Sequence, residues 1–171
     1  MTTFDEVPVP PELADEVERR RAWGADTHDE VWDGEYRMAS AARGVHGILQ
    51  AEAHRVLGPL ARRAGLTPIG DFNVGVPRNC RVPDFGVLRG ETGLTWFPTA
   101  AIVVEVLSPR DTAWEKLGFY AEHEVDELVM VDPDERTVVW LARSGDTYEP
   151  VERSAVLEVD VAEIVTQIDW P

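Results

Sequence analysis

Residues 100–107 read Ala-Ala-Ile-Val-Val-Glu-Val-Leu, and Glu105 is the only polar side chain in this run. The run is short, rich in β-branched residues and closed by Ser108-Pro109. This pattern predicts a strand that is buried on both faces of a sheet. A carboxylate in such a strand costs several kcal/mol unless a cation or a set of hydrogen-bond donors compensates it. Glu105 therefore needs a partner from another part of the chain.

A candidate partner follows the strand. The chain has fifteen arginines and one lysine, Lys116, which lies eleven residues after Glu105. Residues 112–124 predict a helix in which Lys116 and Tyr120 share one face, with His123 close by. A neighbouring stripe is expected to face the core: Trp114, Leu117 and Ala121. A turn over residues 108–112 could fold Lys116 back over Glu105, although the residues alone leave open an ion pair between Glu105 and an arginine.

A second acidic residue precedes the buried strand. Asp84 follows Pro83 within a strand predicted for residues 81–89. Proline cannot donate to the strand ladder, so the chain there is expected at an edge, a bulge or a bend. Two carboxylates on neighbouring strands, Asp84 and Glu105, could approach each other, and such oxygen ligands select magnesium or manganese. An aspartate after proline is also common as a plain turn or strand-end residue.

The other segments predict alternating helices and strands around this centre. In the first half of the chain we expect an arm at 1–11, a helix at 12–23 with Leu13, Val17 and Trp23 on its inner side, and a hairpin at 31–40 with its turn at Asp33-Gly34. A helix at 43–64, which Gly58-Pro59 could kink, and a strand near 67–76 follow. In the second half we expect a meander of strands at 127–132, 137–143 and 147–151 and a last strand at 156–159. This order predicts an α/β or α+β fold with a mixed central sheet flanked by helices. We divide the chain into an arm with a short helix (1–29) and one domain (30–171).

Composition limits the function classes. The chain of 171 residues has a formal charge of −16, which argues against a broad basic surface for nucleic acid and suits divalent cations. A single cysteine, Cys80, excludes an internal disulfide and a cysteine-based zinc site. The acidic N-terminus is unlike a signal peptide and no stretch is long and apolar enough to span a membrane, so we expect a cytoplasmic protein without a membrane partner.

Several of these residues fall into a known arrangement. Pro83-Asp84, then Val-Val-Glu-Val-Leu-Ser-Pro at 103–109, then Lys116 and Tyr120, then Val-Asp-Pro at 131–133 resemble the Uma-two family. These are restriction endonuclease-like proteins of the PD-(D/E)xK nuclease superfamily. Asp33-Gly34-Glu35 and His46 are also similar to the N-terminal pattern of the family, and the resemblance spans about residues 30–150.

The resemblance implies a restriction endonuclease-like fold and a magnesium- or manganese-dependent nuclease site. In that reading Asp84 and Glu105 bind the metal, Lys116 acts as the catalytic lysine, and Glu35 is an auxiliary acid at the rim. The lysine that the superfamily usually has two residues after the glutamate is here Leu107. Glu124 and Leu128 likewise stand where a glycine and an aromatic residue are expected.

We therefore expect a metal-dependent endonuclease that acts on DNA despite the negative charge, and a homodimer is left open. The alternative is a catalytically degraded module of the same fold that serves a protein partner. A two-carboxylate enzyme such as a glycosidase is a weaker reading, because it leaves Lys116 without a task. His46, Gln50 and His54 share a helical stripe that we interpret as a polar face, and the six tryptophans are expected to pack in the core and at edges.

Overall fold

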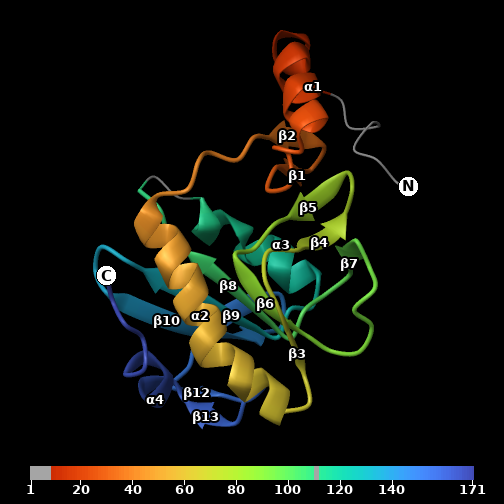
Figure 1. The fold of residues 1–171 in the computed structure, drawn as a ribbon. Helices are drawn as coiled ribbons and strands as arrows, with labels where there is room; N and C mark the ends of the chain where they lie inside the picture. Colours follow the sequence, from red (N-terminus) through yellow and green to blue (C-terminus); the bar gives the residue numbers. More distant parts are fainter. Residues whose placement is uncertain (1–8, 110–111) are drawn as a thin grey trace.

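The structure, a computed structural model, describes residues 9–109 and 112–171. Most of the arm predicted for residues 1–11 therefore lies outside the described residues, as do residues 110–111 of the turn predicted after the buried strand. Figure 1 shows a long helix, α2 (Gly44–Arg63), crossing one face of a sheet, with α1 (Ala14–Trp23) and a hairpin at one end of the molecule and α4 (Val161–Val165) at the other. No helix among the described residues is both long enough and apolar enough to cross a membrane.

The larger sheet has six strands in the order β11-β10-β9-β8-β6-β3. Their bounds are Thr67–Ile69 for β3, Phe85–Leu88 for β6, Ile102–Val106 for β8, Glu127–Asp132 for β9, Thr137–Ser144 for β10 and Thr147–Pro150 for β11. Strands β8 and β9 run parallel, whereas the other neighbours are antiparallel. All five residues of β8 are buried, so the predicted buried strand in a mixed sheet is confirmed.

Alternation along β8 decides which layer Glu105 faces. Helix α2 (Gly44–Arg63) packs on the face that carries Ile102 and Val104. The other face, which carries Val103, packs against the 3₁₀ turn Ala113–Lys116 and helix α3 (Leu117–Glu122). Because successive strand residues point to opposite faces, Glu105 shares the α3 side with Val103.

The smaller sheet has five strands in the order β2-β1-β5-β4-β7. Their bounds are Glu30–Trp32 for β1, Glu35–Arg37 for β2, Asn73–Val76 for β4, Asn79–Arg81 for β5 and Trp96–Phe97 for β7. The predicted hairpin is present, and Asp33 and Gly34 take positive φ angles of 50° and 88° in its turn. The strands predicted near 67–76 and 81–89 are each divided between the two sheets, and the second crosses at Pro83. The bend expected there is confirmed.

The first helix packs on the smaller sheet. Helix α1 (Ala14–Trp23) follows a 3₁₀ turn, Pro11–Leu13, and buries Val17 against Val31 and Cys80. The inward position predicted for Trp23 is wrong, because the helix ends there at Gly24 and the indole is 80% exposed. Trp114 is also 47% exposed rather than in the core. It lies in a 3₁₀ turn, with three residues per turn, so it departs from the stripe predicted for an α-helix, whereas Leu117 and Ala121 pack against the core as predicted.

The C-terminal segment closes the core under α2. Short strands β12 (Arg153–Ser154) and β13 (Val159–Asp160) pair with each other, and helix α4 (Val161–Val165) follows. The strand predicted at 156–159 is therefore wrong except at its last residue. The intervening turn instead buries Leu157, which belongs to the same apolar cluster as α2.

A buried carboxylate ties this segment to the large sheet. Glu127, at the start of β9, is 2% exposed. It accepts hydrogen bonds from Trp140 Nε1 at 2.8 Å and Ser154 Oγ at 2.6 Å. The backbone N–H groups of Ala155 and Val156 add two more, at 2.7 and 3.1 Å. Four donors compensate the burial of this charge, so Glu127 fixes the β12 region on the sheet.

Candidate active site

Asp84, Glu105 and Lys116 line a single cleft of about 950 Å³ where the two sheets meet. Asp84 lies at the crossing between the sheets and Glu105 near the end of β8. Lys116 comes from the turn that leads into α3. The three residues that the sequence selected are thus brought together from three elements.

Lys116 is held between two carboxylates. Its Nζ lies 3.0 and 3.1 Å from the two carboxylate oxygens of Glu105 and 2.9 Å from Oε1 of Glu30. Tyr120, one helical turn later, donates its hydroxyl to Glu105 Oε1 at 2.5 Å. The predicted shared face of Lys116 and Tyr120 is confirmed. Within the described part of the chain, the cation paired with Glu105 is this lysine and not an arginine, which favours the first of the two alternatives that the residues alone left open.

Glu30 is a site residue that sequence reasoning missed. It begins β1, and its carboxylate also accepts hydrogen bonds from Val82 N at 2.8 Å and from Trp32 Nε1 at 2.6 Å. The sequence predicts the hairpin turn at Asp33-Gly34, and the strands on its two sides carry Glu30 as well as Glu35. Either glutamate could have been considered for the site. A three-residue strand is too short for periodicity to show which of its acids points inward.

Glu35 is not part of the cleft. Its side chain is 70% exposed and lies 3.4 Å from Arg37. In β2 the inward position is taken by Tyr36, which is buried, so the alternation of the strand turns Glu35 outward. The acid that reaches the site from this hairpin is Glu30.

Asp84 is oriented by donors from two elements. Its Oδ2 accepts a hydrogen bond from the backbone N–H of Val106 at 2.7 Å. Its Oδ1 lies 2.7 Å from His46 Nε2, and Gln50 donates to its carbonyl oxygen at 2.7 Å. His46 and Gln50 lie four residues apart on α2, and the polar stripe predicted there is turned toward Asp84. This contact was missed because helical spacing shows a shared face but not what the face meets.

Burial and neighbouring charges set the protonation of the cluster. Burial raises the pKa of Glu105 to about 7; Lys116 opposes this rise, and Asp84 and Glu30 add to it. Burial lowers the pKa of Lys116, but Glu105 and Glu30 outweigh it and raise the pKa overall. The ammonium therefore keeps its charge, whereas Glu105 titrates near neutral pH.

The donor set suits a hard cation. Among the described residues, no group of three or more histidine, cysteine, aspartate or glutamate side chains could hold a metal ion by itself. Asp84 and Glu105 offer carboxylate oxygens in one cleft with room for water and a ligand. Magnesium is commonly held by one or two carboxylates together with waters and substrate phosphates, so these residues fit magnesium or manganese better than an all-protein zinc site.

Known proteins place this fold. A search of curated proteins gave no match. Among solved structures, the chain is similar to a protein described as a "putative nuclease belonging to DUF820" from Anabaena variabilis ATCC 29413, with 17% identity and a TM-score of 0.65 over 81% of this chain and 90% of the other. A family model named Uma2, described as "Putative restriction endonuclease", matches residues 14–169. The predicted resemblance is thereby confirmed: the chain belongs to the Uma2 family and has a restriction endonuclease-like fold.

Proposed function

We propose that this protein is a metal-dependent endonuclease that hydrolyses phosphodiester bonds in DNA. The observation that carries the proposal is the cluster of Glu30, Asp84, Glu105 and Lys116 in one cleft. Two acids around one buried ammonium, with a third acid in the same cleft, are a costly arrangement for a merely structural purpose. Membership of a family described as restriction endonucleases supports the same reaction class.

In this proposal Asp84 and Glu105 hold magnesium or manganese. A metal bound there would supply positive charge to the phosphoryl oxygens and lower the pKa of a water molecule. Asp84 is kept in place for this task by the N–H of Val106 and by His46. Glu105 must be ionised to bind a cation, and Lys116 and Tyr120 both donate hydrogen bonds to that ionised form.

Lys116 is the proposed catalytic cation. Its ammonium lines the cleft beside Glu105, where it can stabilise charge that develops on a phosphoryl oxygen or orient the attacking water. Glu30 lies on β1, and its carboxylate holds the ammonium of Lys116 at 2.9 Å. In this proposal it acts through Lys116 by fixing the position of that ammonium. We assign Glu30 the part of a positioning residue; Glu35, expected as an auxiliary acid at the rim, does not line the cleft.

A second function is favoured by a different observation. The formal charge of −16 opposes a polyanionic substrate and suits an interaction module with a basic protein partner. In that case the acidic cluster would be a remnant of a nuclease site that no longer acts.

Cleavage of a supercoiled plasmid by the full chain, with magnesium or manganese, tests the choice. Parent protein should nick the plasmid, whereas Asp84→Asn and Glu105→Gln should abolish nicking and weaken metal binding measured by calorimetry. Glu149→Gln, at an exposed position on β11, is the matched control and should behave like the parent. Absence of both cleavage and metal binding in the parent would favour the interaction module.

A further inference from the structure

The lining of the cleft has the opposite charge balance to the molecule. Among the residues that the structure describes, four cationic side chains reach it: Arg20, Arg37, Arg43 and Lys116. Three acids reach it as well, namely Glu30, Asp84 and Glu105. With histidines neutral, the described residues of the lining carry a formal charge of +1 in a chain of −16. A polyanion is therefore repelled by most of the surface but not by this cleft.

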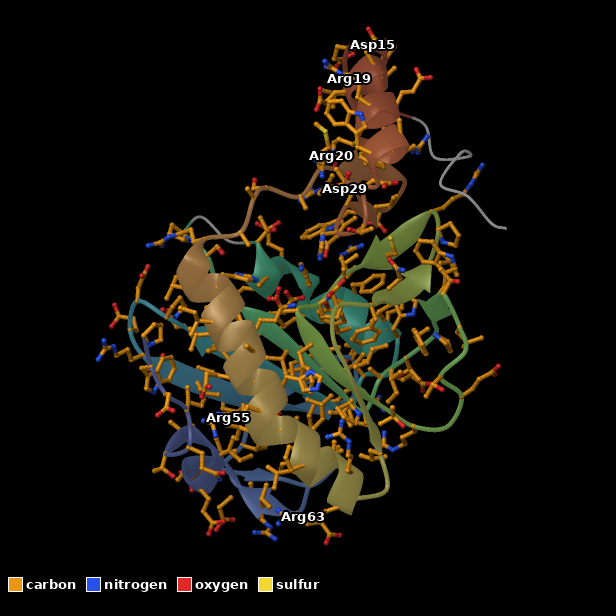
Figure 2. The ribbon with its side chains drawn as sticks, in the orientation of Figure 1. Asp15, Arg19, Arg20, Asp29, Arg55 and Arg63 are labelled. Carbon is orange, nitrogen blue, oxygen red and sulfur yellow. The ribbon has the colours of Figure 1, made fainter. Side chains whose placement is uncertain are left out.

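Two of the arginines are available to a ligand. Arg20 is committed to the fold, because its guanidinium lies 2.9 and 2.5 Å from the carboxylate of Asp29 where α1 meets β1 (Figure 2). Arg43 is exposed at the N-cap of α2; its carbonyl oxygen accepts hydrogen bonds from His46 and Gly47, but no hydrogen bond or ion pair joins its guanidinium to another residue within the described ranges. Arg37 has a 40% exposed side chain that is stacked 3.9 Å from the centre of the Trp32 ring. Its only ion pair in the described part of the chain is the long contact with Glu35.

The reacting groups lie deeper than these arginines. The exposed fractions of the Glu105, Lys116 and Glu30 side chains are 6%, 9% and 13%. Residues 38–43, which connect β2 to α2 (Figure 1), line one wall of the cleft, and four of them are alanine or serine. The volume of about 950 Å³ is that of a small-ligand pocket. A cleft of this volume has room for a few nucleotide units of one strand. It has no room for a duplex, because a duplex is a wide cylinder that carries its phosphates on the outside.

We propose that the cleft takes a single strand of DNA, whose phosphates are held at the rim by Arg37 and Arg43 while one phosphodiester descends to Asp84 and Glu105. The inference rests on the proposed function and names the substrate class of that site. Grooves lined by cationic side chains track the backbone of a single strand without reading its sequence. A duplex would have to fray or present a flap before it could reach the acids.

Binding by the full-length Asp84→Asn protein tests this proposal. In magnesium buffer, a labelled single-stranded oligonucleotide should bind roughly tenfold or more tightly than the blunt duplex of the same sequence. Arg37→Gln and Arg43→Gln should each weaken single-strand binding several-fold and reduce the salt dependence of log K by about one. Arg63→Gln is the control, because Arg63 lies at the far end of α2 (Figure 2), about 30 Å from Arg43 along a twenty-residue helix.

Equal or tighter binding of the duplex would overturn the inference, and so would unchanged single-strand binding by both rim variants. The outcomes separate this inference from the proposed function. Metal-dependent cleavage of duplex and single strand at equal rates keeps the endonuclease and removes the single-strand cleft. Tight, rim-dependent binding of the single strand with no cleavage by the parent protein keeps the cleft and removes the endonuclease.

Discussion

Lys116 gives a structural reason for the one lysine in a chain with fifteen arginines. Its Nζ lies within 3.1 Å of three carboxylate oxygens of Glu30 and Glu105, and the residue is 7% exposed. A compact ammonium can donate to all of these oxygens from one point, whereas a planar guanidinium spreads its donors over a wider fork. A lysine on a helix is usually exposed to solvent, whereas Lys116 is buried.

Replacement of Lys116 by arginine should therefore remove most nuclease activity. The larger group must shift within a packed pocket, and a misplacement of about 1 Å can cost on the order of a hundredfold in rate. Overpacking should also lower the free energy of unfolding by about 1–3 kcal/mol. Plasmid cleavage at fixed manganese and urea denaturation measure the two effects. Full activity in Lys116→Arg would take Lys116 out of the site.

Glu105 should make stability depend on pH. Its folded-state pKa of about 7 lies above the ordinary value of 4.5, so its protonated form favours folding. That contribution is present in full below the unfolded pKa and is lost as the pH rises through the folded pKa. The stability of parent protein relative to Glu105→Gln should fall between about pH 5 and pH 8, by about 3 kcal/mol at most.

Urea denaturation in metal-free buffer checks this difference. At the upper end of the range Glu105→Gln should equal or exceed the parent in stability, because Lys116 still has Glu30 as a partner. A difference between the two proteins that stays constant with pH would mean that Glu105 is ionised throughout.

At the scale of elements, the sequence predicted what local pattern decides. The apolar run at residues 100–107 predicted β8. The helical spacing of apolar residues at 43–64 predicted α2, which continues through Pro59 without interruption. The strands near residues 67–76 and 81–89 were predicted as single units because period-two alternation does not show which partner a strand joins. Their division between two sheets depends on pairing with distant residues such as those of β1 and β8.

The same limit explains the site. Asp84, Glu105 and Lys116 could be found because each is exceptional in its own segment: an acid after proline, an acid in an apolar strand and the lone lysine. Glu30 has no such mark, and its role depends on how the smaller sheet docks beside Lys116. The resemblance to the Uma-two family supplied the connection among the first three and pointed to Glu35 in place of Glu30.

The hydrogen bonds to Glu127 should be needed to hold the C-terminal segment on the large sheet. Glu127→Gln replaces a carboxylate oxygen by an NH₂ group that would face existing donors, including Ser154 Oγ and the N–H of Ala155. We expect a loss of about 1–3 kcal/mol in the free energy of unfolding. Chemical denaturation measures this loss, and Glu149→Gln on exposed β11 should change little. Equal free energies of unfolding of the two variants would show that the hydrogen bonds to Glu127 do not stabilise the fold.

Two glycines test the packing of the sheet against its surroundings. A Cβ at Gly86 in β6 would overlap the ring of Phe72 and lie 3.1 Å from the carbonyl oxygen of Ile102. Gly86→Ala should therefore lower the free energy of unfolding by about 1–3 kcal/mol. A Cβ at Gly118 in α3 would meet no atom within 4 Å apart from its chain neighbours and the backbone of its own helix. Gly118→Ala should thus stabilise the protein by about 0.5–1 kcal/mol, and the opposite order of melting temperatures would contradict this account of the packing.

At the scale of the whole molecule, a charge of −16 should oppose the compact state. Raising sodium chloride from about 20 to about 200 mM should raise the melting temperature, because the added ions screen this repulsion. Parent protein and Asp84→Asn should respond alike to sodium chloride. At matched ionic strength, magnesium chloride should stabilise the parent further but not the variant, since only site binding adds to screening. An equal magnesium effect in both would mean that Asp84 holds no metal.

The cleft is assembled from two stretches of chain that are separate in sequence. Asp84, Glu105 and Lys116 belong to the large sheet and its helix, whereas residues 30–43 supply Glu30, both rim arginines and the wall between them. Under the proposed function, the metal ligands and the groups that select the strand therefore come from different segments, linked by Glu30, which holds Lys116 from within residues 30–43. Exchange of residues 30–43 between family members would transplant substrate choice while leaving the metal ligands of the recipient in place, as long as the incoming segment keeps the glutamate that holds Lys116.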